Sequence, residues 1–154
     1  MPSSESTSTG AVSAAHGFDM RAASAWNPDL ALLIARILIV AIFPIAGYLK
    51  LTGWAGTVGT MERYGLPLPT VAAALATAAE LILPVLVILG IWTRQALLGL
   101  ILFTVVATLL AHRFWEFEGA QWFPQLANFW KNVGLIGGMT VVSAFGPGRY
   151  ALRP

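Results

Sequence analysis

The sequence predicts an all-α integral membrane protein, a four-helix bundle with antiparallel up-down topology. Of its 154 residues, 57% are hydrophobic and only 10% are charged. A water-soluble domain carries about 25% charged residues. Four apolar stretches of helical length follow one another, each long enough to cross the roughly 30 Å hydrocarbon core of a bilayer. At this length they leave room for a tail and short loops but for no second domain.

Composition also excludes several functions. Nine Lys and Arg stand against seven Asp and Glu without any basic run, so nucleic-acid binding is not expected. The chain has no cysteine, which excludes thiol and persulfide chemistry by the chain alone. Its two histidines are His16 and His112. With so few ligands we expect neither haem nor a metal site, so any redox carrier must be borrowed from elsewhere.

Residues 1–26 are predicted to be a disordered tail, because they begin with a Ser/Thr/Gly/Ala stretch without helical periodicity. They lack the positive segment and apolar run of a cleavable signal peptide. The membrane domain is therefore assigned to residues 27–154, and its first span is expected to act as the membrane signal.

The first predicted span covers about residues 30–50. It follows Asn27 and Pro28, a capping residue and a proline at the first helical position. The Gly- and Pro-rich residues 51–69 are predicted to form an aqueous or interfacial loop. The second span covers about 71–89 and stops at Gly90.

The third span covers about residues 95–112, and the four-residue link before it requires an antiparallel neighbour. Residues 113–124 are rich in aromatic side chains and place Trp115 and Trp122 where an interfacial belt would lie. The fourth span covers about 126–145. Both termini are assigned to the cytoplasmic side by a four-to-three balance of basic residues: Arg21, Arg94, Arg149 and Arg153 against Lys50, Arg63 and Arg113.

Two ionisable residues lie deep in the first two spans. Arg36 lies about 10 Å and Glu80 about 14 Å from the cytoplasmic ends of their spans, which predicts an interhelical ion pair. Pro84 frees the carbonyl of Glu80, and Pro44 acts likewise in the first span, so both helices are expected to bend. The pair either forms part of a functional polar pocket or only fixes helix register.

Three further basic residues, Lys50, His112 and Lys131, are expected toward the opposite face. Together they could line a basic pocket for a quinone carbonyl or an anion. Lys131 shares a helix face with Gly134 and Gly138, a spacing that permits close helix contact and points Lys131 inward. In the alternative interpretation both lysines reach the lipid headgroups and His112 only marks a helix end.

The chain resembles the DoxX family of small four-span bacterial membrane proteins. The resemblance covers residues 30–153 and rests on five elements in order: Arg36, Phe43, Gly47 and Lys50-Leu51; Gly65-Leu66-Pro67 through Glu80 to Gly90 and Thr93-Arg94; His112; Lys131-Asn132; and Gly146-Pro147-Gly148-Arg149-Tyr150. The ending departs from the family, which often reads Ser-Leu-Asp where this chain has Ala151-Leu152-Arg153. Any role of that aspartate is not carried over.

The resemblance implies a bacterial inner-membrane protein of the kind often labelled an oxidoreductase. Some relatives are similar to the membrane subunit of thiosulfate:quinone oxidoreductase, and others associate with redox-stress enzymes. The matching polar positions are Arg36, Lys50, Glu80, His112 and Lys131.

Three functions follow from these observations. In the first, the chain is a membrane subunit for quinone-linked redox chemistry that acts together with a soluble or membrane redox partner protein, and the chain itself can be a homo-oligomer. In this function Glu80 relays a proton, and His112 or Lys131 binds a quinone oxygen. In the second, it is a non-catalytic scaffold or assembly factor for a soluble redox enzyme. Small-solute transport is the third, and the absence of an inverted repeat weighs against it.

Overall fold

The computed structural model describes residues 27–153, which form six α-helices and two short 3₁₀ helices. The predicted disordered tail, residues 1–26, lies outside the described residues. In chain order the elements are α1 (Pro28–Val40), α2 (Ile42–Thr52), α3 (Trp54–Arg63), α4 (Pro69–Leu89), α5 (Thr93–Ala111), η1 (Phe114–Glu116), η2 (Gly119–Gln121) and α6 (Trp122–Phe145). The part of the chain described contains no strand, so the all-α prediction is confirmed.

The helices form where the four apolar stretches were predicted. Three segments are long and apolar enough to cross a membrane, namely Pro28–Thr52, Pro69–Leu89 and Thr93–Glu116. The fourth predicted span lies in α6, which has 24 residues. Its first half carries Asn128, Lys131 and Asn132, and these side chains lower its hydropathy. Leu38, Leu75 and Leu102 expose 70%, 68% and 66% of their surface, which suits side chains that face lipid.

The first span starts as predicted and then breaks. The Asn27 side chain caps α1 by accepting hydrogen bonds from the backbone of Asp29 and Leu30, at 3.0 and 3.4 Å. The helix is interrupted at Ala41, three residues before Pro44. Pro44 has no N–H to donate to the carbonyl one turn earlier, which accounts for a break at this level. In contrast, α4 stays continuous through the buried Pro84.

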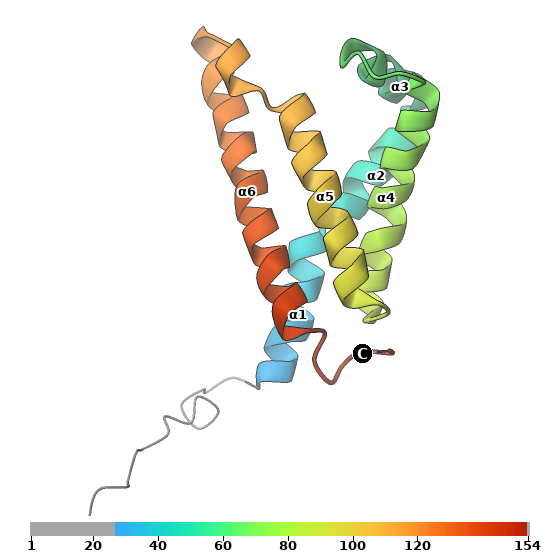
Figure 1. Cartoon of the computed structure of the whole chain (residues 1–154), viewed down its shortest axis with the longest axis vertical. Helices are drawn as coiled ribbons and strands as arrows, with labels where there is room; N and C mark the ends of the chain where they lie inside the picture. Colours follow the sequence, from blue (N-terminus) through green and yellow to red (C-terminus); the bar gives the residue numbers. More distant parts are fainter. Residues whose placement is uncertain (1–26, 154) are drawn as a thin grey trace, which may run out of the picture.

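The helices pack as two diverging pairs. The helices α5 and α6 run side by side, and α2 and α4 form a second pair (Figure 1). The pairs meet near the start of α1 and the C-terminal segment, and they spread apart toward α3 (Figure 1). We call these two ends of the bundle the C-terminal end and the α3 end.

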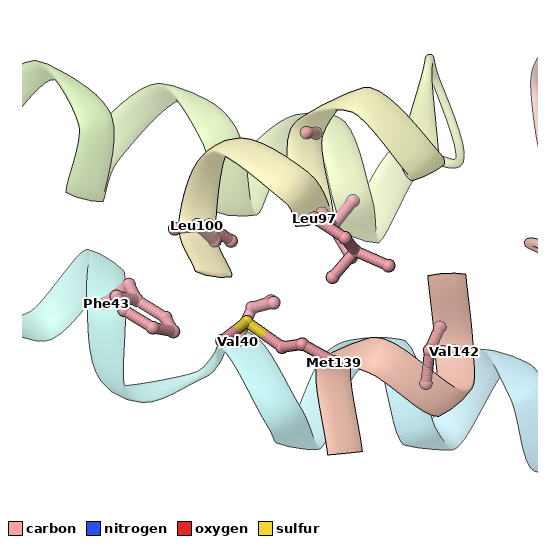
Figure 2. Packing of buried hydrophobic residues seen from close by; sticks show 8 residues of the cluster. Val40, Phe43, Leu97, Leu100, Met139 and Val142 are labelled. Atoms are coloured by element: carbon pink, nitrogen blue, oxygen red, sulfur yellow. The ribbon is translucent and has the colours of Figure 1, made fainter. Parts of the chain in front are cut away.

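The buried core lies toward the C-terminal end. Figure 2 shows six of its side chains, which come from the first, third and fourth predicted spans: Val40, Phe43, Leu97, Leu100, Met139 and Val142. Val87 and Ala96 complete the buried cluster. The core therefore ties the helices together at one end and leaves the other end open.

The predicted loop at residues 51–69 is wrong in its central part, because residues 54–63 form α3. The helix packs on α4 and α2 and buries Thr57 and Met61, which lie four residues apart on one face. The Thr57 hydroxyl also donates to the carbonyl of Lys50 at 3.0 Å. Three glycines in and beside this helix lower its intrinsic propensity, so the sequence resembles a loop, whereas packing stabilises a helix.

Residues 113–124, the aromatic-rich connection between α5 and α6, contain regular structure. This connection contains η1 and η2, and α6 begins at Trp122, four residues before the predicted start. Phe114, Trp115, Phe129 and Trp130 stack edge to face in series. Trp115, Trp122 and Trp130 remain more than 40% exposed, as side chains of an interfacial belt would be.

Candidate functional site

A cavity of about 1180 Å³ lies between the two helix pairs toward the α3 end. Most of its wall is apolar and comes from α1, α2, α4, α5 and α6. The highly exposed Leu38, Leu75 and Leu102 are part of this wall, so the cavity has an apolar opening at the molecular surface. Among its polar lining residues are Lys50, Glu80, Thr104, His112, Lys131 and Asn132. This combination suits a ligand that is mostly apolar and has a polar head.

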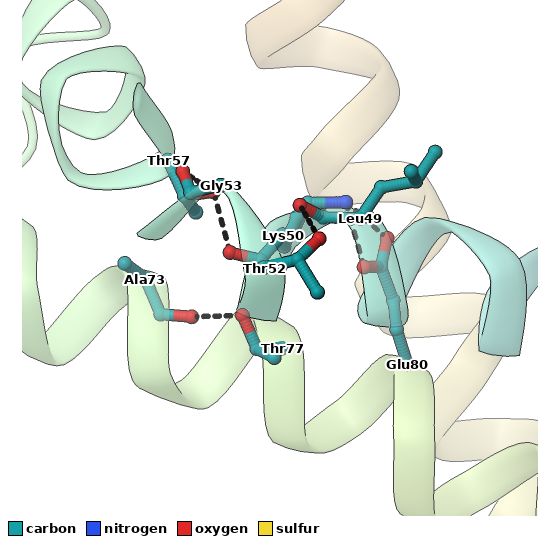
Figure 3. A network of polar contacts seen from close by, with 8 residues as sticks. All are labelled: Leu49, Lys50, Thr52, Gly53, Thr57, Ala73, Thr77 and Glu80. Carbon is teal, nitrogen blue, oxygen red and sulfur yellow. Dashed lines mark hydrogen bonds and ion pairs between the residues drawn. The ribbon is translucent and has the colours of Figure 1, made fainter. Parts of the chain in front are cut away.

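The strongest polar contact in this wall is an ion pair between α2 and α4. Lys50 Nζ lies 2.7 Å from Glu80 Oε1 and 2.6 Å from Oε2, and the two side chains point toward each other in Figure 3. The Glu80 side chain is 7% exposed and that of Lys50 is 29% exposed. A carboxylate at this depth is stable only with such a partner.

The predicted pair between Arg36 and Glu80 is therefore wrong. Similar depth does not bring two side chains together, because each side chain on a helix leans toward the N-terminus of its own helix. Because α1 begins near the C-terminal end and α4 begins near the α3 end (Figure 1), Arg36 leans toward the C-terminal end, whereas Glu80 leans toward the α3 end. Lys50, one helix further along the chain, leans back from the α3 end and meets Glu80.

Arg36 instead holds the C-terminal segment. Its side chain is completely buried, and Nη2 donates a hydrogen bond to the carbonyl oxygen of Tyr150. Its Nε and Nη1 have no hydrogen-bond partner within residues 27–153. The guanidinium lies beside Gly90, next to the carboxyl end of α4, where the helix dipole favours a cation.

The same segment is bonded to the turn between α4 and α5. The backbone N–H of Leu152 donates to the carbonyl of Leu89, and that of Arg153 donates to Gly90, both at 3.1 Å. The backbone N–H of Arg149 donates to the Asp29 carboxylate at 3.0 Å. Sequence reasoning missed these contacts, since backbone acceptors leave no pattern of residue types.

On the α5–α6 side, Thr108 and His112 lie four residues apart and bond to side chains of α6. Thr108 Oγ1 accepts a hydrogen bond from Asn132 Nδ2 at 2.9 Å, and His112 Nδ1 lies 3.0 Å from Gln125 Oε1. The roles of the two ring nitrogens depend on the tautomer: in the one that donates from Nδ1 to the amide oxygen, Nε2 is an acceptor. Gln125 was not predicted, because a single Gln near a helix start gives no distinctive signal.

The structure thus regroups the predicted polar residues. Lys50, Glu80, His112 and Lys131 all line the same cavity, whereas Arg36 is not part of its lining. Lys131 makes no ion pair with any residue of the described part of the chain. The cavity wall therefore holds one neutralised pair and one further cation.

Comparison with known proteins settles the family. The model of the family described as DoxX matches residues 31–113. The chain belongs to the DoxX family. Arg36, Lys50, Glu80 and His112 lie in the DoxX match, and Lys131 follows it. The resemblance seen in the sequence is thereby confirmed.

The chain is similar to two inner membrane proteins of Escherichia coli (strain K12). The chain is 38% identical to the inner membrane protein YphA over 121 residues. This alignment covers 79% of the chain and 86% of YphA. The chain is 33% identical over 127 residues to the inner membrane protein YqjF, covering 80% and 90%. No solved structure matches the chain. This is a DoxX-family membrane protein, and three of its described segments are long and apolar enough to cross a membrane.

Proposed function

We propose that α6 is the fourth span of an antiparallel four-helix bundle in the bacterial inner membrane, with the C-terminal end in the cytoplasm. Twenty-four residues at about 1.5 Å each cover the hydrocarbon core. Its polar first half faces the cavity through Lys131 and Asn132, so it does not require lipid contact there. Arg94, Arg149 and Arg153 flank the C-terminal end, which suits the cytoplasmic side. Both named relatives are called inner membrane proteins.

We further propose that the cavity binds the head of a lipid-soluble quinone, which makes this chain a membrane subunit of quinone-linked redox chemistry. The observation that carries the proposal is a cavity with an apolar, exposed wall that also contains Lys50, Glu80, His112 and Lys131. A ligand dissolved in the bilayer reaches this cavity without crossing water. The volume of about 1180 Å³ exceeds the roughly 300 to 1,000 Å³ of ordinary ligand pockets, leaving space for part of an isoprenoid tail.

The chain's own residues would bind and orient the head. Lys131 Nζ and Lys50 Nζ are donors for carbonyl oxygens, and the free Nε2 of His112 is an acceptor for a hydroxyl. Glu80, held by Lys50, can accept a proton and return it. A bound quinone supplies a two-electron, two-proton couple, and a partner protein must exchange the electrons, since this chain has no cysteine and no predicted metal site.

Quinone titration tests the proposal directly. We expect saturable binding of ubiquinone or menaquinone to the purified chain in nanodiscs. Glu80→Gln and His112→Ala should each weaken binding about 10-fold or more, because a lost hydrogen bond to a charged or buried group costs about 1.5 to 3 kcal/mol. Intrinsic fluorescence quenching of the tryptophans measures the affinity.

Glu116→Gln is the matched control, since Glu116 is an exposed carboxylate that pairs with Arg113 outside the cavity. Its affinity should equal that of the unmodified chain. The quinone proposal fails if no binding saturates, or if Glu80→Gln and Glu116→Gln behave alike.

A non-catalytic scaffold is the second candidate, and the exposed aromatic side chains at the α3 end favour it. Trp115, Phe123 and Trp130 expose 55%, 67% and 59% of their surface, and aromatic residues are enriched where proteins bind one another. A scaffold should capture a soluble partner in mild detergent, and the Glu80→Gln variant should capture that partner as well as the unmodified chain does.

A further inference from the structure

A second, smaller cavity lies on the other side of Lys50. It has a volume of about 220 Å³ and lies between α2 and α3, lined by Lys50, Gly53, Gly56, Thr57, Thr60 and Met61. Lys50, Thr60 and Met61 also line the large cavity. The Lys50 side chain therefore borders both the large cavity and the smaller one between α2 and α3.

The smaller cavity has the size and chemistry to hold water. At about 30 Å³ for each molecule, it has room for several. Thr57 and Thr60 place hydroxyl oxygens in its wall, and both hydroxyls bond to backbone carbonyls of the same region. A Cβ added to Gly56 would meet no atom within 4 Å, so this glycine leaves space open rather than allowing close packing.

The α3 end is also the end from which water can arrive. Here α3 carries the exposed Glu62 and Arg63, which need an aqueous or headgroup environment. In the opposite direction, Val40, Leu97, Leu100 and Met139 are fully buried and close the bundle between the ion pair and the C-terminal end. Water can therefore reach Glu80 from the α3 end but not from the C-terminal end.

We propose that the smaller cavity is a water path through which the Lys50–Glu80 pair exchanges protons with the aqueous phase at the α3 end. The function of this path rests on the proposed ligand of the large cavity, which the same pair faces from its other side. The exchange is a simple proton transfer: the Glu80 carboxylate takes a proton from hydronium, leaving water, and later returns it. Charged or titratable groups that line the large cavity with Glu80 are Lys50 from α2, Tyr64 at the end of α3, His112 at the end of α5 and Lys131 from α6.

This arrangement separates two solvents at one ion pair. A lipid-soluble ligand would approach from the bilayer, while protons would enter or leave beneath α3. Because both routes meet at Lys50, the proton released or consumed by the ligand's hydroxyl group need not cross the apolar wall. Protons would then exchange at the α3 end and not at the C-terminal end.

The absence of native cysteine allows a direct test by thiol labelling. In nanodiscs, Thr57→Cys is treated with a positively charged, membrane-impermeant methanethiosulfonate. We expect its labelling rate to exceed that of the core variant Val40→Cys by at least about 100-fold. Adding Gly56→Leu, or the smaller Gly56→Val if the leucine variant does not fold, should slow labelling at least about 10-fold by filling the cavity.

Gly59→Leu is the matched control for the filling variants. Gly59 lies on the same helix outside the cavity lining, and a Cβ there would meet only the end of Arg63, at 4.0 Å. Labelling of Thr57→Cys should keep its rate in this background. Equal slowing by Gly56→Leu and Gly59→Leu, or labelling of Thr57→Cys as slow as Val40→Cys, overturns the water path.

Infrared difference spectra test proton exchange itself. On rapid acidification, a protonated carboxyl band that is missing in Glu80→Gln should appear, and Gly56→Leu should delay it at least about 10-fold. Labelling without this band, or a band unaffected by Gly56→Leu, contradicts exchange through the cavity. Neither readout uses quinone, so failure of the quinone titration alone would refute the proposed ligand and leave the path standing.

Discussion

Gly90→Ala is expected to destabilise the protein by about 2 to 5 kcal/mol, the sum of backbone strain and overpacking. Gly90 has φ +74° at the end of α4, where an alanine is strained. Its new Cβ would also lie 2.5 Å from the Ala151 Cβ and from Arg36 Nη1. The C-terminal segment must move away, and the Arg36 guanidinium then loses its bond to Tyr150. Denaturation by SDS, followed by circular dichroism, measures the loss.

Gly65→Ala separates the two causes. Gly65 has nearly the same backbone angle, φ +70°, but a Cβ there would meet nothing within 4 Å. This control should cost only about 1 kcal/mol, the strain of a left-handed backbone. Protease digestion of the C-terminal segment should accelerate in Gly90→Ala alone. If the two variants lose equal stability, the packing of residues 149–153 against Gly90 contributes nothing.

The spans could be predicted because their determinants are local. The length of an apolar run predicts the length of the span, and capping residues such as Asn27-Pro28 and Gly90 predict its ends. The structure places the helices within a few residues of these bounds. The same reasoning missed α3, whose stability comes from contacts of Thr57 and Met61 with other helices. A glycine-rich segment conceals a helix when packing, rather than propensity, stabilises it.

The sequence could predict which residues line the cavity, but it could not predict which of them form an ion pair. Four of the five predicted polar residues line one cavity, since ionisable residues in a span must avoid lipid and so gather inside. Which cation meets Glu80 depends on the direction in which each side chain leans, and depth along the span does not contain that information. Helix polarity would have excluded Arg36 and favoured a residue nearer the end of the first span.

The two residues of the Lys50–Glu80 ion pair should be strongly coupled, and the two single substitutions should differ in their cost in stability. Lys50→Met leaves the Glu80 carboxylate unpaired at 7% exposure, which should cost about 3 kcal/mol or more. Glu80→Leu should cost less, because Lys50 is 29% exposed and its ammonium can turn into the smaller cavity. The double variant Lys50→Met/Glu80→Leu should come within about 1 kcal/mol of the unmodified chain, since apolar residues replace a buried pair at little cost.

A double-mutant cycle in SDS titrations measures this coupling. The Arg113–Glu116 pair is the control, with side chains 41% and 45% exposed, and its cycle should return at most about 0.5 kcal/mol, as exposed pairs do. If the Lys50 and Glu80 substitutions are additive, or if Glu80→Leu is the more damaging of the two, then Lys50 does not hold the carboxylate in the membrane. We expect this asymmetry because, of the two partners, only Lys50 lines both cavities, so its ammonium has a second space to occupy when Glu80 is removed.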